Sequence, residues 1–276
     1  MFSIVTNVCP IDGARIRKTL PHWLRVFGSS LIQVLVVVDR KPPEGRIANL
    51  HASETNEEEN IDNTLAQLQK LDQRVIACDL DYSRLADISK YWFKNGAPIR
   101  CQAGTPIFAF IYALQLAESQ YVLKLDCDML FCNNGFPDQA IASLQGERLA
   151  LVEPARLYHT EDEKFSTRAY LLDIDALKRH LPINAHKLDY LRRIHRRIQG
   201  KPDYLALEQM LQKEIALGEL SKIVLPQDCG FSMHVPRREQ FLEDNIDSVI
   251  ERVELGQVPI GQLVTSWDYS REHWAD

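Results

Sequence analysis

The chain has 276 residues and a net charge of −6, and its residues are 45% hydrophobic and 25% charged. These values are typical of a soluble globular protein of one large domain or two small ones. The acidic balance argues against a nucleic-acid-binding protein, which would carry a basic excess. No apolar run is long enough to cross a bilayer, and the first residues lack the basic region of a signal peptide. The six cysteines form no Cys-x-x-Cys pair, so we expect reduced thiols and a cytoplasmic protein.

The first half of the chain alternates between strand patterns and helix patterns. Apolar, β-branched runs predict strands, and apolar residues at helical spacing predict helices. The expected strands cover residues 2–8, 32–38 and 74–78, and the expected helices cover residues 12–27, 61–71 and 107–117, with another near 81–89. This alternation predicts an α/β fold with a mostly parallel central sheet flanked by helices.

Two carboxylates directly follow a fourth apolar strand, residues 121–125. They are Asp126 and Asp128, with only Cys127 between them. On an extended backbone, residues i and i+2 point to the same side, so both carboxylates can reach one point. Like charges this close repel unless a cation lies between them, and Mg²⁺ or Mn²⁺ prefers carboxylate oxygens. Ligands of open α/β sheets bind at the carboxyl ends of strands, so we predict a metal–phosphate site here. The alternative is that both aspartates are turn residues that end the strand.

Two further residues are candidates for contact with a nucleotide. Asp39 ends the strand 32–38, where an acid often accepts hydrogen bonds from a base or ribose, although a solvated turn acid would look the same. Arg100 lies in the proline- and glycine-rich loop 95–106, ahead of the helix 107–117, where it could meet a diphosphate. A surface role is the alternative for this arginine.

The second half of the chain continues the α/β pattern. We expect helices at residues 136–144, 174–180 and 203–217, and strands at 149–152, 166–173, 221–225 and 231–235. The tail holds an amphipathic helix with Ile246, Val249, Ile250 and Val253 on its apolar face. The basic stretch 187–201 is a candidate for peripheral contact with a membrane surface or an acidic acceptor, although such faces are usually only solvated.

The order of these elements, with the motif Tyr121-Val-Leu-Lys-Leu-Asp-Cys-Asp, resembles the GT-A-fold glycosyltransferases of the family 2-like, Asp-x-Asp type. The likeness extends over residues 1–236 and is most specific near 98–131 and 203–235. It implies a transferase that depends on Mn²⁺ or Mg²⁺ and moves a hexosyl or related group from a nucleotide-diphosphate sugar. The acceptor would be a sugar, a lipid-linked group or a small molecule, and no nucleic acid would take part.

The resemblance also implies roles for individual residues. Thr6 and Asp39 would contact the nucleobase and ribose, and Asp126 would lie near the ribose or a metal-bound water. Arg100 or Arg168 would help to neutralise the departing diphosphate.

The metal ligands implied by the resemblance are Asp126, Asp128 and His234, with Asp128 binding the metal directly. A lone histidine is more often structural than a ligand, and only the two aspartates favour the metal role for His234.

The general base is the point at which the chain departs from the family. Glu208 matches the first acid of an acidic pair that opens a helix, but Gln209 stands where the second acid would be. An inverting transfer needs a carboxylate to accept the proton of the acceptor hydroxyl. Glu208, Glu153 or Asp228 would have to serve, or the enzyme retains configuration and needs no such base.

Three other functions fit parts of the pattern. A haloacid-dehalogenase-type phosphatase also has an Asp-x-Asp after an apolar strand, but near the start of its domain and followed by a small or hydroxyl residue, where this chain has Met129. A nucleotidyltransferase of the same fold would need a glycine- and arginine-rich loop after the first strand, and this sequence lacks such a loop there. A nucleotide-binding module with a degenerate site remains open because of Gln209.

The predicted domain organisation is one GT-A-like domain followed by a tail. Residues 1–131 would form the nucleotide-sugar half, residues 132–236 the acceptor half, and residues 237–276 a helical tail.

Overall fold

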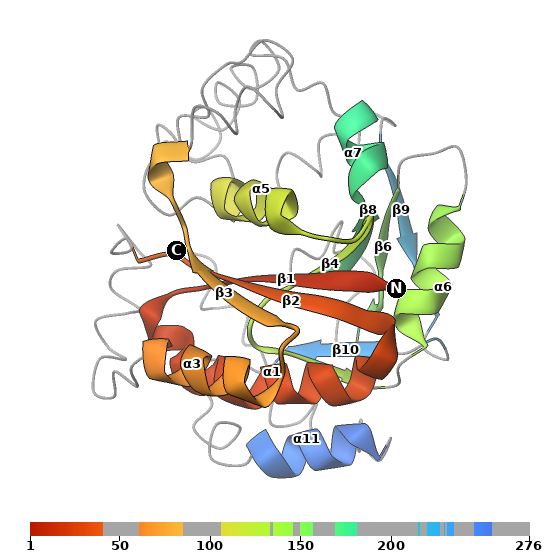
Figure 1. Ribbon diagram of the computed structural model, residues 1–276. Coiled ribbons are helices and arrows are strands. Elements are labelled where there is room, and N and C mark those ends of the chain that lie inside the picture. The colour runs from red at the N-terminus through yellow and green to blue at the C-terminus, as the bar shows by residue number, and fades with distance from the viewer. Residues whose placement is uncertain are drawn as a thin grey trace, which may run out of the picture.

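The computed structural model is shown in Figure 1. It describes residues 1–40, 61–84, 106–132, 135–145, 150–156, 169–180, 215, 220–226, 229, 231–234 and 246–255. Among the helices in these ranges, none is both long enough and apolar enough to cross a membrane.

A seven-stranded sheet forms the centre of the molecule, in the order β3-β2-β1-β4-β8-β6-β9. β8 pairs antiparallel with both of its neighbours, β4 and β6, while the pairings β3–β2, β2–β1, β1–β4 and β6–β9 are parallel. The strands are β1 (Phe2–Val8), β2 (Leu31–Val38), β3 (Val75–Asp79), β4 (Tyr121–Leu125), β6 (Ala150–Glu153), β8 (Ala169–Asp173) and β9 (Ser221–Val224). The predicted fold class, a mostly parallel sheet flanked by helices, is therefore confirmed.

Helices cover both faces of this sheet (Figure 1). On one face lie α5 (Pro106–Leu116) and α7 (Ile174–His180). On the other lie α1 (Gly13–Phe27), α3 (Ile61–Leu71) and α6 (Phe136–Leu144). Three short 3-10 helices, η1 (Pro10–Asp12), η2 (Gly28–Ser30) and η3 (Tyr82–Arg84), complete the connections in these parts of the chain. Gly28, at the end of α1, has a positive φ of 50°, which glycine adopts at no steric cost.

The alternation of side chains along each strand divides the core in two. In β1, Val5 packs on the α5 face, whereas Ile4 packs on the α1 face. In β2, Leu35 and Val37 face α5, whereas Val34, Val36 and Val38 face α1, so the strand is apolar throughout residues 34–38. A strand covered by helices on both sides must bury both sets of side chains, which explains the continuous apolar run in this segment.

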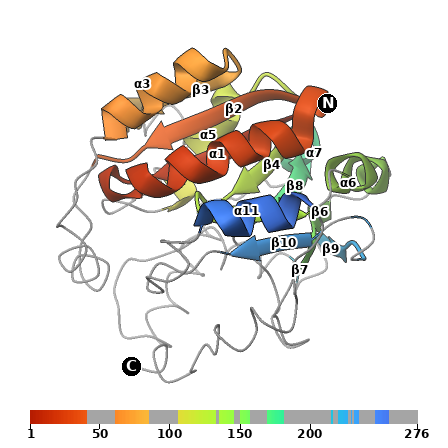
Figure 2. The same cartoon turned by 90° about the horizontal axis from the view of Figure 1, so that it is seen from below.

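A second, three-stranded sheet lies beside the first, in the order β5-β10-β7 (Figure 2). Its strands are β5 (Met129–Cys132), β10 (Phe231–His234) and β7 (Ala155–Arg156). The helix α11 (Ile246–Glu254) packs against β5 and α1. Its buried residues are Ile246, Val249, Ile250 and Val253, which are the four that the apolar pattern predicts.

The structure differs from the sequence-based expectations at several elements. β5 was not expected, because its four apolar residues directly continue the motif and look like part of the same segment. Glu153 is the last residue of β6 and does not follow the strand. Near residues 81–89, the described part contains only η3. The predicted helix 203–217 lies outside the described residues except at 215. The proposed domain boundaries stay a prediction, although α11 packs on the central domain.

The packing of α11 yields a stability test. Ile250 is buried against the domain and Glu251, the next residue, is exposed. Ile250→Ala removes buried apolar volume and should lower the free energy of unfolding by about 2–5 kcal/mol. Glu251→Ala, as the matched control, should change it by less than about 0.5 kcal/mol. Urea denaturation measures both, and equal effects would show that α11 is not packed on the domain in solution.

Candidate functional site

The carboxyl ends of four strands bring the predicted site residues to one edge of the sheet. β1, β2 and β4 run parallel, and β6 runs in the same direction because two antiparallel pairings separate it from β4. Thr6 and Glu153 lie near the ends of β1 and β6, Asp39 follows β2, and Asp126 follows β4. Residues distant in the sequence therefore meet where open α/β sheets bind ligands.

The first motif aspartate has a cationic partner that the sequence argument missed. Lys124, on β4, forms an ion pair with Asp126 through Nζ and Oδ1. The lysine side chain is 8% exposed, whereas that of Asp126 is 39% exposed. A lysine two residues before an aspartate points to the same side of a strand, and this spacing was the available signal. Repulsion between the aspartates therefore does not by itself require a metal ion.

Three side chains of α1 fix the backbone around the motif. Thr19 Oγ1 lies 2.6 Å from the carbonyl oxygen of Cys127, and Trp23 Nε1 donates to the carbonyl oxygen of Met129 at 2.7 Å. The backbone N–H of Phe131 donates to His22 Nε2 at 3.0 Å. The three helix residues share one buried face, and their partners alternate along the chain from 127 to 131. Asp128, 6% exposed, lies inside this clamped segment.

Two hydrogen bonds hold the imidazole of His22 in the neutral tautomer that carries its proton on Nδ1. Nε2 accepts from Phe131, so the proton is on Nδ1, which lies 2.9 Å from Glu254 Oε1 on α11. Burial in the core lowers the pKa of His22 from its ordinary value, against the hydrogen bond to Glu254, which raises it. Although burial raises the pKa of Glu254, hydrogen bonds from Arg25 and His22 outweigh it and leave this pKa lowered. The imidazole is therefore neutral in the folded protein at neutral pH.

The two predicted nucleotide contacts at β1 and β2 have different surroundings. Asp39 is held by Tyr82, whose hydroxyl lies 3.0 Å from both carboxylate oxygens. Thr6 is fully buried, and its hydroxyl makes no hydrogen bond within the described part of the chain. Asp39 is therefore preorganised at the edge, while Thr6 in this structure lies in the core.

Glu153, one of the candidate bases, is fully buried on the α5 side of the sheet. Lys124 pairs with Tyr170 of β8, and the pairs Leu151–Leu172 and Val152–Leu171 put Glu153 next to Tyr170 in the same register. Three ionisable side chains thus form a row across β4, β8 and β6, and all are buried. We call Lys124, Tyr170 and Glu153 the buried polar row.

His234 approaches the motif through its backbone. In β10 it pairs with Met129 of β5, the residue after Asp128. Among the side chains that the structure describes, no group of three or more His, Cys, Asp and Glu is arranged to hold a metal ion. The side chain of His234 is outside that set, as are Arg100, Arg168, Glu208 and Asp228. Their roles stay predictions.

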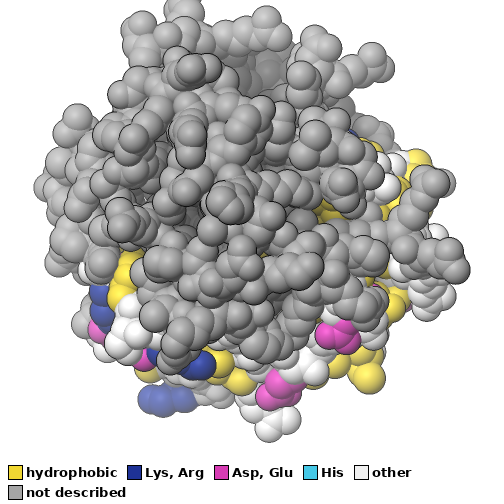
Figure 3. Space-filling model, turned by 90° about the horizontal axis from the view of Figure 1, so that it is seen from above, with side chains coloured by type: hydrophobic (Ala, Val, Ile, Leu, Met, Phe, Trp, Pro, Cys, Tyr) yellow, Lys and Arg dark blue, Asp and Glu magenta, His cyan; other side chains and the backbone are white. Residues whose placement is uncertain are grey.

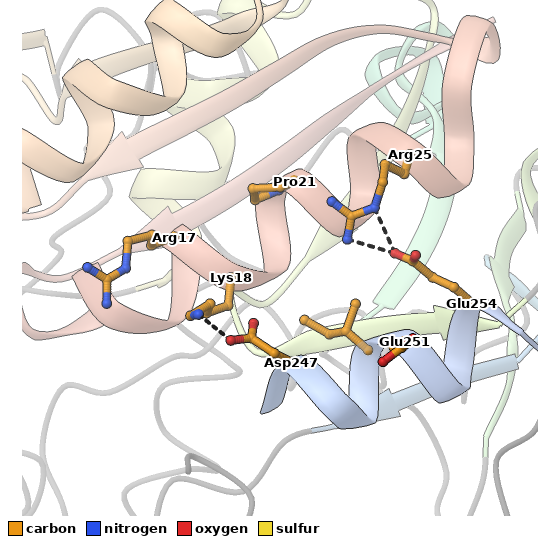
Figure 4. Close-up of a pocket in the computed structure, with 8 residues that line it drawn as sticks. Arg17, Lys18, Pro21, Arg25, Asp247, Glu251 and Glu254 are labelled. Carbon is orange, nitrogen blue, oxygen red and sulfur yellow. Dashed lines mark hydrogen bonds and ion pairs between the residues drawn. The ribbon is translucent and has the colours of Figure 1, made fainter. Parts of the chain in front are cut away.

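A groove of about 340 Å³ lies between α1 and α11 (Figure 4). Pro21 and Ile250 line it, and the ion pairs Lys18–Asp247 and Arg25–Glu254 flank them. These pairs fasten α11 to α1. In the view from above, Lys or Arg and Asp or Glu side chains of the described residues lie among hydrophobic ones along the lower margin of the molecule (Figure 3).

Comparison with known proteins finds likeness only in structure. No protein-family model and no curated protein matches the chain. A mannosyltransferase from Pyrobaculum calidifontis, solved with GDP-Man and Mn²⁺, matches 93% of this chain and 62% of its own, with 13% identity and a TM-score of 0.49. The galactosyltransferase LgtC, solved with donor and acceptor sugar analogues, matches 90% of this chain and 95% of its own (11% identity, TM-score 0.48). The 4-diphosphocytidyl-2C-methyl-D-erythritol synthase of Anaerococcus prevotii matches 91% of this chain and 96% of its own (9% identity, TM-score 0.45).

The clamp by α1 predicts a selective effect on stability. Thr19→Val keeps the volume but removes the donor to the Cys127 carbonyl, which should lower the free energy of unfolding by about 1–3 kcal/mol. Thr6→Val is the matched control, because Thr6 is equally buried but has no hydrogen bond to lose among the residues that the structure describes. It should be neutral or stabilising. Equal destabilisation of the two variants in urea titrations would contradict the assigned hydrogen bond.

The lowered pKa of His22 predicts a pH dependence. The unfolded chain takes up a proton at His22 near pH 6.5, whereas the folded chain does so only at lower pH. The neutral imidazole of His22 therefore makes its full contribution to the free energy of unfolding above pH 6.5. This contribution decreases as the pH falls below 6.5. Unfolding free energies at pH 7.5 and 5.5 should differ more in the wild type than in His22→Gln. The same pH slope in both proteins would show that His22 is not the group responsible.

Proposed function

We propose that this protein is a metal-dependent glycosyltransferase that moves a sugar from a nucleotide-diphosphate sugar to an acceptor hydroxyl. The observation that carries the proposal is the Asp-x-Asp motif at the carboxyl edge of a mostly parallel sheet, with its backbone clamped by α1. A site that binds a charged diphosphate repeatedly needs ligands held in place before binding, because ordering them would reduce affinity.

The residues of the motif suit a hard divalent cation. Asp128 supplies carboxylate oxygens from a fixed backbone, and the register brings the His234 backbone next to it. Carboxylate oxygens, with a single imidazole, are a donor set for Mn²⁺ or Mg²⁺. We infer that Asp128, His234 and, in part, Asp126 would hold the ion. Once bound, it would stabilise the negative charge that develops on the departing diphosphate.

The nucleotide would lie across the ends of β1 and β2. Asp39, fixed by Tyr82, can accept hydrogen bonds from a ribose or base. The predicted contact from Thr6 would require its buried hydroxyl to become accessible. Arg100 and Arg168 are the proposed cations for the diphosphate.

Three carboxylates are candidates for the general base that would accept the proton of the acceptor hydroxyl. If transfer inverts configuration, Glu208 is the leading candidate and Asp228 a second. Glu153 is buried on the same side of the sheet as Lys124, two strands away from it. An acceptor hydroxyl could reach this carboxylate only through a path from the surface. If transfer retains configuration, the chain needs no such base.

We also place the reaction in the cytoplasm. The five cysteines in the described ranges are all free, as expected for a reducing compartment. The acceptor is proposed to be a sugar, a lipid-linked group or a small molecule, with the basic stretch 187–201 available for an acidic acceptor or a membrane surface.

Replacement of Asp128 tests the function. Asp128→Asn should abolish stabilisation by UDP or GDP with Mn²⁺, because the neutral amide is a poor ligand for a hard cation. Thermal shift measures this, and Asp138→Asn on the exposed face of α6 is the matched control. In the wild type, excess EDTA should remove the shift. Full nucleotide binding by Asp128→Asn, or full binding in EDTA, would refute the metal site.

Turnover assays separate the proposal from the related activities. A glycosyltransferase releases a nucleoside diphosphate from a nucleotide sugar, and a nucleotidyltransferase releases pyrophosphate instead. Metal-dependent nucleotide binding without turnover of any donor would point to a binding module.

A further inference from the structure

We propose that Lys124 is an internal cation that holds Asp126 and so gives the two motif aspartates different tasks. The resemblance to the GT-A-fold glycosyltransferases already implies that Asp128 binds the metal and that Asp126 lies near the ribose or a metal-bound water; Lys124 would supply the physical cause of this division. This inference rests on the proposed function, because it concerns the same metal and nucleotide.

The geometry of β4 supports the assignment. Lys124 and Asp126 project from the same side of the strand, and the ammonium and carboxylate are in direct contact. The lysine is largely removed from water, and the aspartate is more than a third exposed. A buried ammonium is costly unless a carboxylate remains beside it, so Lys124 has a continuing requirement for an anion.

The buried polar row restricts where Lys124 can move. Its neighbours in the sheet register are Tyr170 and, beyond it, Glu153, both fully or almost fully buried. The lysine is therefore buried beside Tyr170 in the sheet while its ammonium contacts Asp126. We infer that its charge stays at the site when a ligand binds.

The fixed charge has a direct consequence for metal binding. A cation that approaches Asp126 must compete with the ammonium of Lys124 for the carboxylate. The attraction between two opposite unit charges in direct contact is reduced by solvent at a partly exposed carboxylate but remains large enough to change the affinity of a competing cation. The same positive charge favours the diphosphate of the donor. Lys124 therefore weakens binding of the metal alone relative to binding of the metal with its nucleotide.

A double-mutant cycle on the full chain tests this. The affinity for Mn²⁺ alone is measured by isothermal titration calorimetry for wild type, Lys124→Met, Asp126→Asn and the double variant. Lys124→Met removes the charge but keeps an unbranched apolar side chain of similar length. It should bind Mn²⁺ about tenfold more tightly than the wild type, because Asp126 becomes available to the ion. In the Asp126→Asn background, the same substitution should change the affinity by less than about twofold.

The outcomes decide between specific alternatives. Unchanged or weaker Mn²⁺ binding by Lys124→Met would overturn the inference, because Lys124 would then be only a structural counter-ion. Equal tightening in both backgrounds would also overturn it, because the lysine would act through a general field and not through Asp126. Lys124→Gln provides a second neutral variant with the same expected result, should the methionine variant not fold. If the wild type binds neither Mn²⁺ nor UDP or GDP, the proposed function fails as well.

Discussion

The hydrogen bonds from α1 to the backbone of residues 127–131 are the constraint on which the candidate site depends. A motif at the end of a strand is normally part of a turn, where the backbone has several conformations of similar energy. Here Thr19, His22 and Trp23 satisfy backbone groups on alternate residues, so the segment is fixed before any ligand arrives. The same contacts let β5 begin at Met129 and pair with β10, which brings His234 to the motif. One helix face thus connects the large sheet, the small sheet and the carboxylates.

Electrostatics at this edge differ on the two sides of the sheet. On the α5 side, Lys124 offsets the charge of Asp126 beside buried Tyr170 and Glu153. On the α1 side, the neutral imidazole of His22 accepts a hydrogen bond from the backbone of Phe131, and its Nδ1–H donates to Glu254 on α11. Buried groups that are neutral or paired with an opposite charge have a smaller desolvation cost than isolated buried charges. The partly exposed carboxylate of Asp126 can therefore meet a ligand, while the buried groups behind it are neutral or paired.

The sequence predicts the fold better than it predicts the site. The apolar run in β2 and the four apolar positions of α11 record burial directly, so their periodicity identified both elements. The direction of β8 could not be read, because a fully buried strand has the same apolar pattern in either orientation. Lys124 could have been paired with Asp126 from its spacing. The contacts of Thr19 and Trp23 could not, because their partners lie 108 and 106 residues away and side-chain polarity alone does not identify them.

The position of Glu254 has a consequence for the order in which the molecule is built. It completes the hydrogen bonding of His22 across 232 residues of chain, and Arg25 reaches the same carboxylate across 229. Closing so long a loop is entropically unfavourable until most other contacts exist, and it slows folding. During synthesis, α1 and the first strands emerge long before α11, so His22 is without this acceptor until residue 254 has left the ribosome. A fragment that ends before residue 246 would contain every strand of both sheets and the complete Asp-x-Asp motif, yet the imidazole beneath β5 would be left without its anchor.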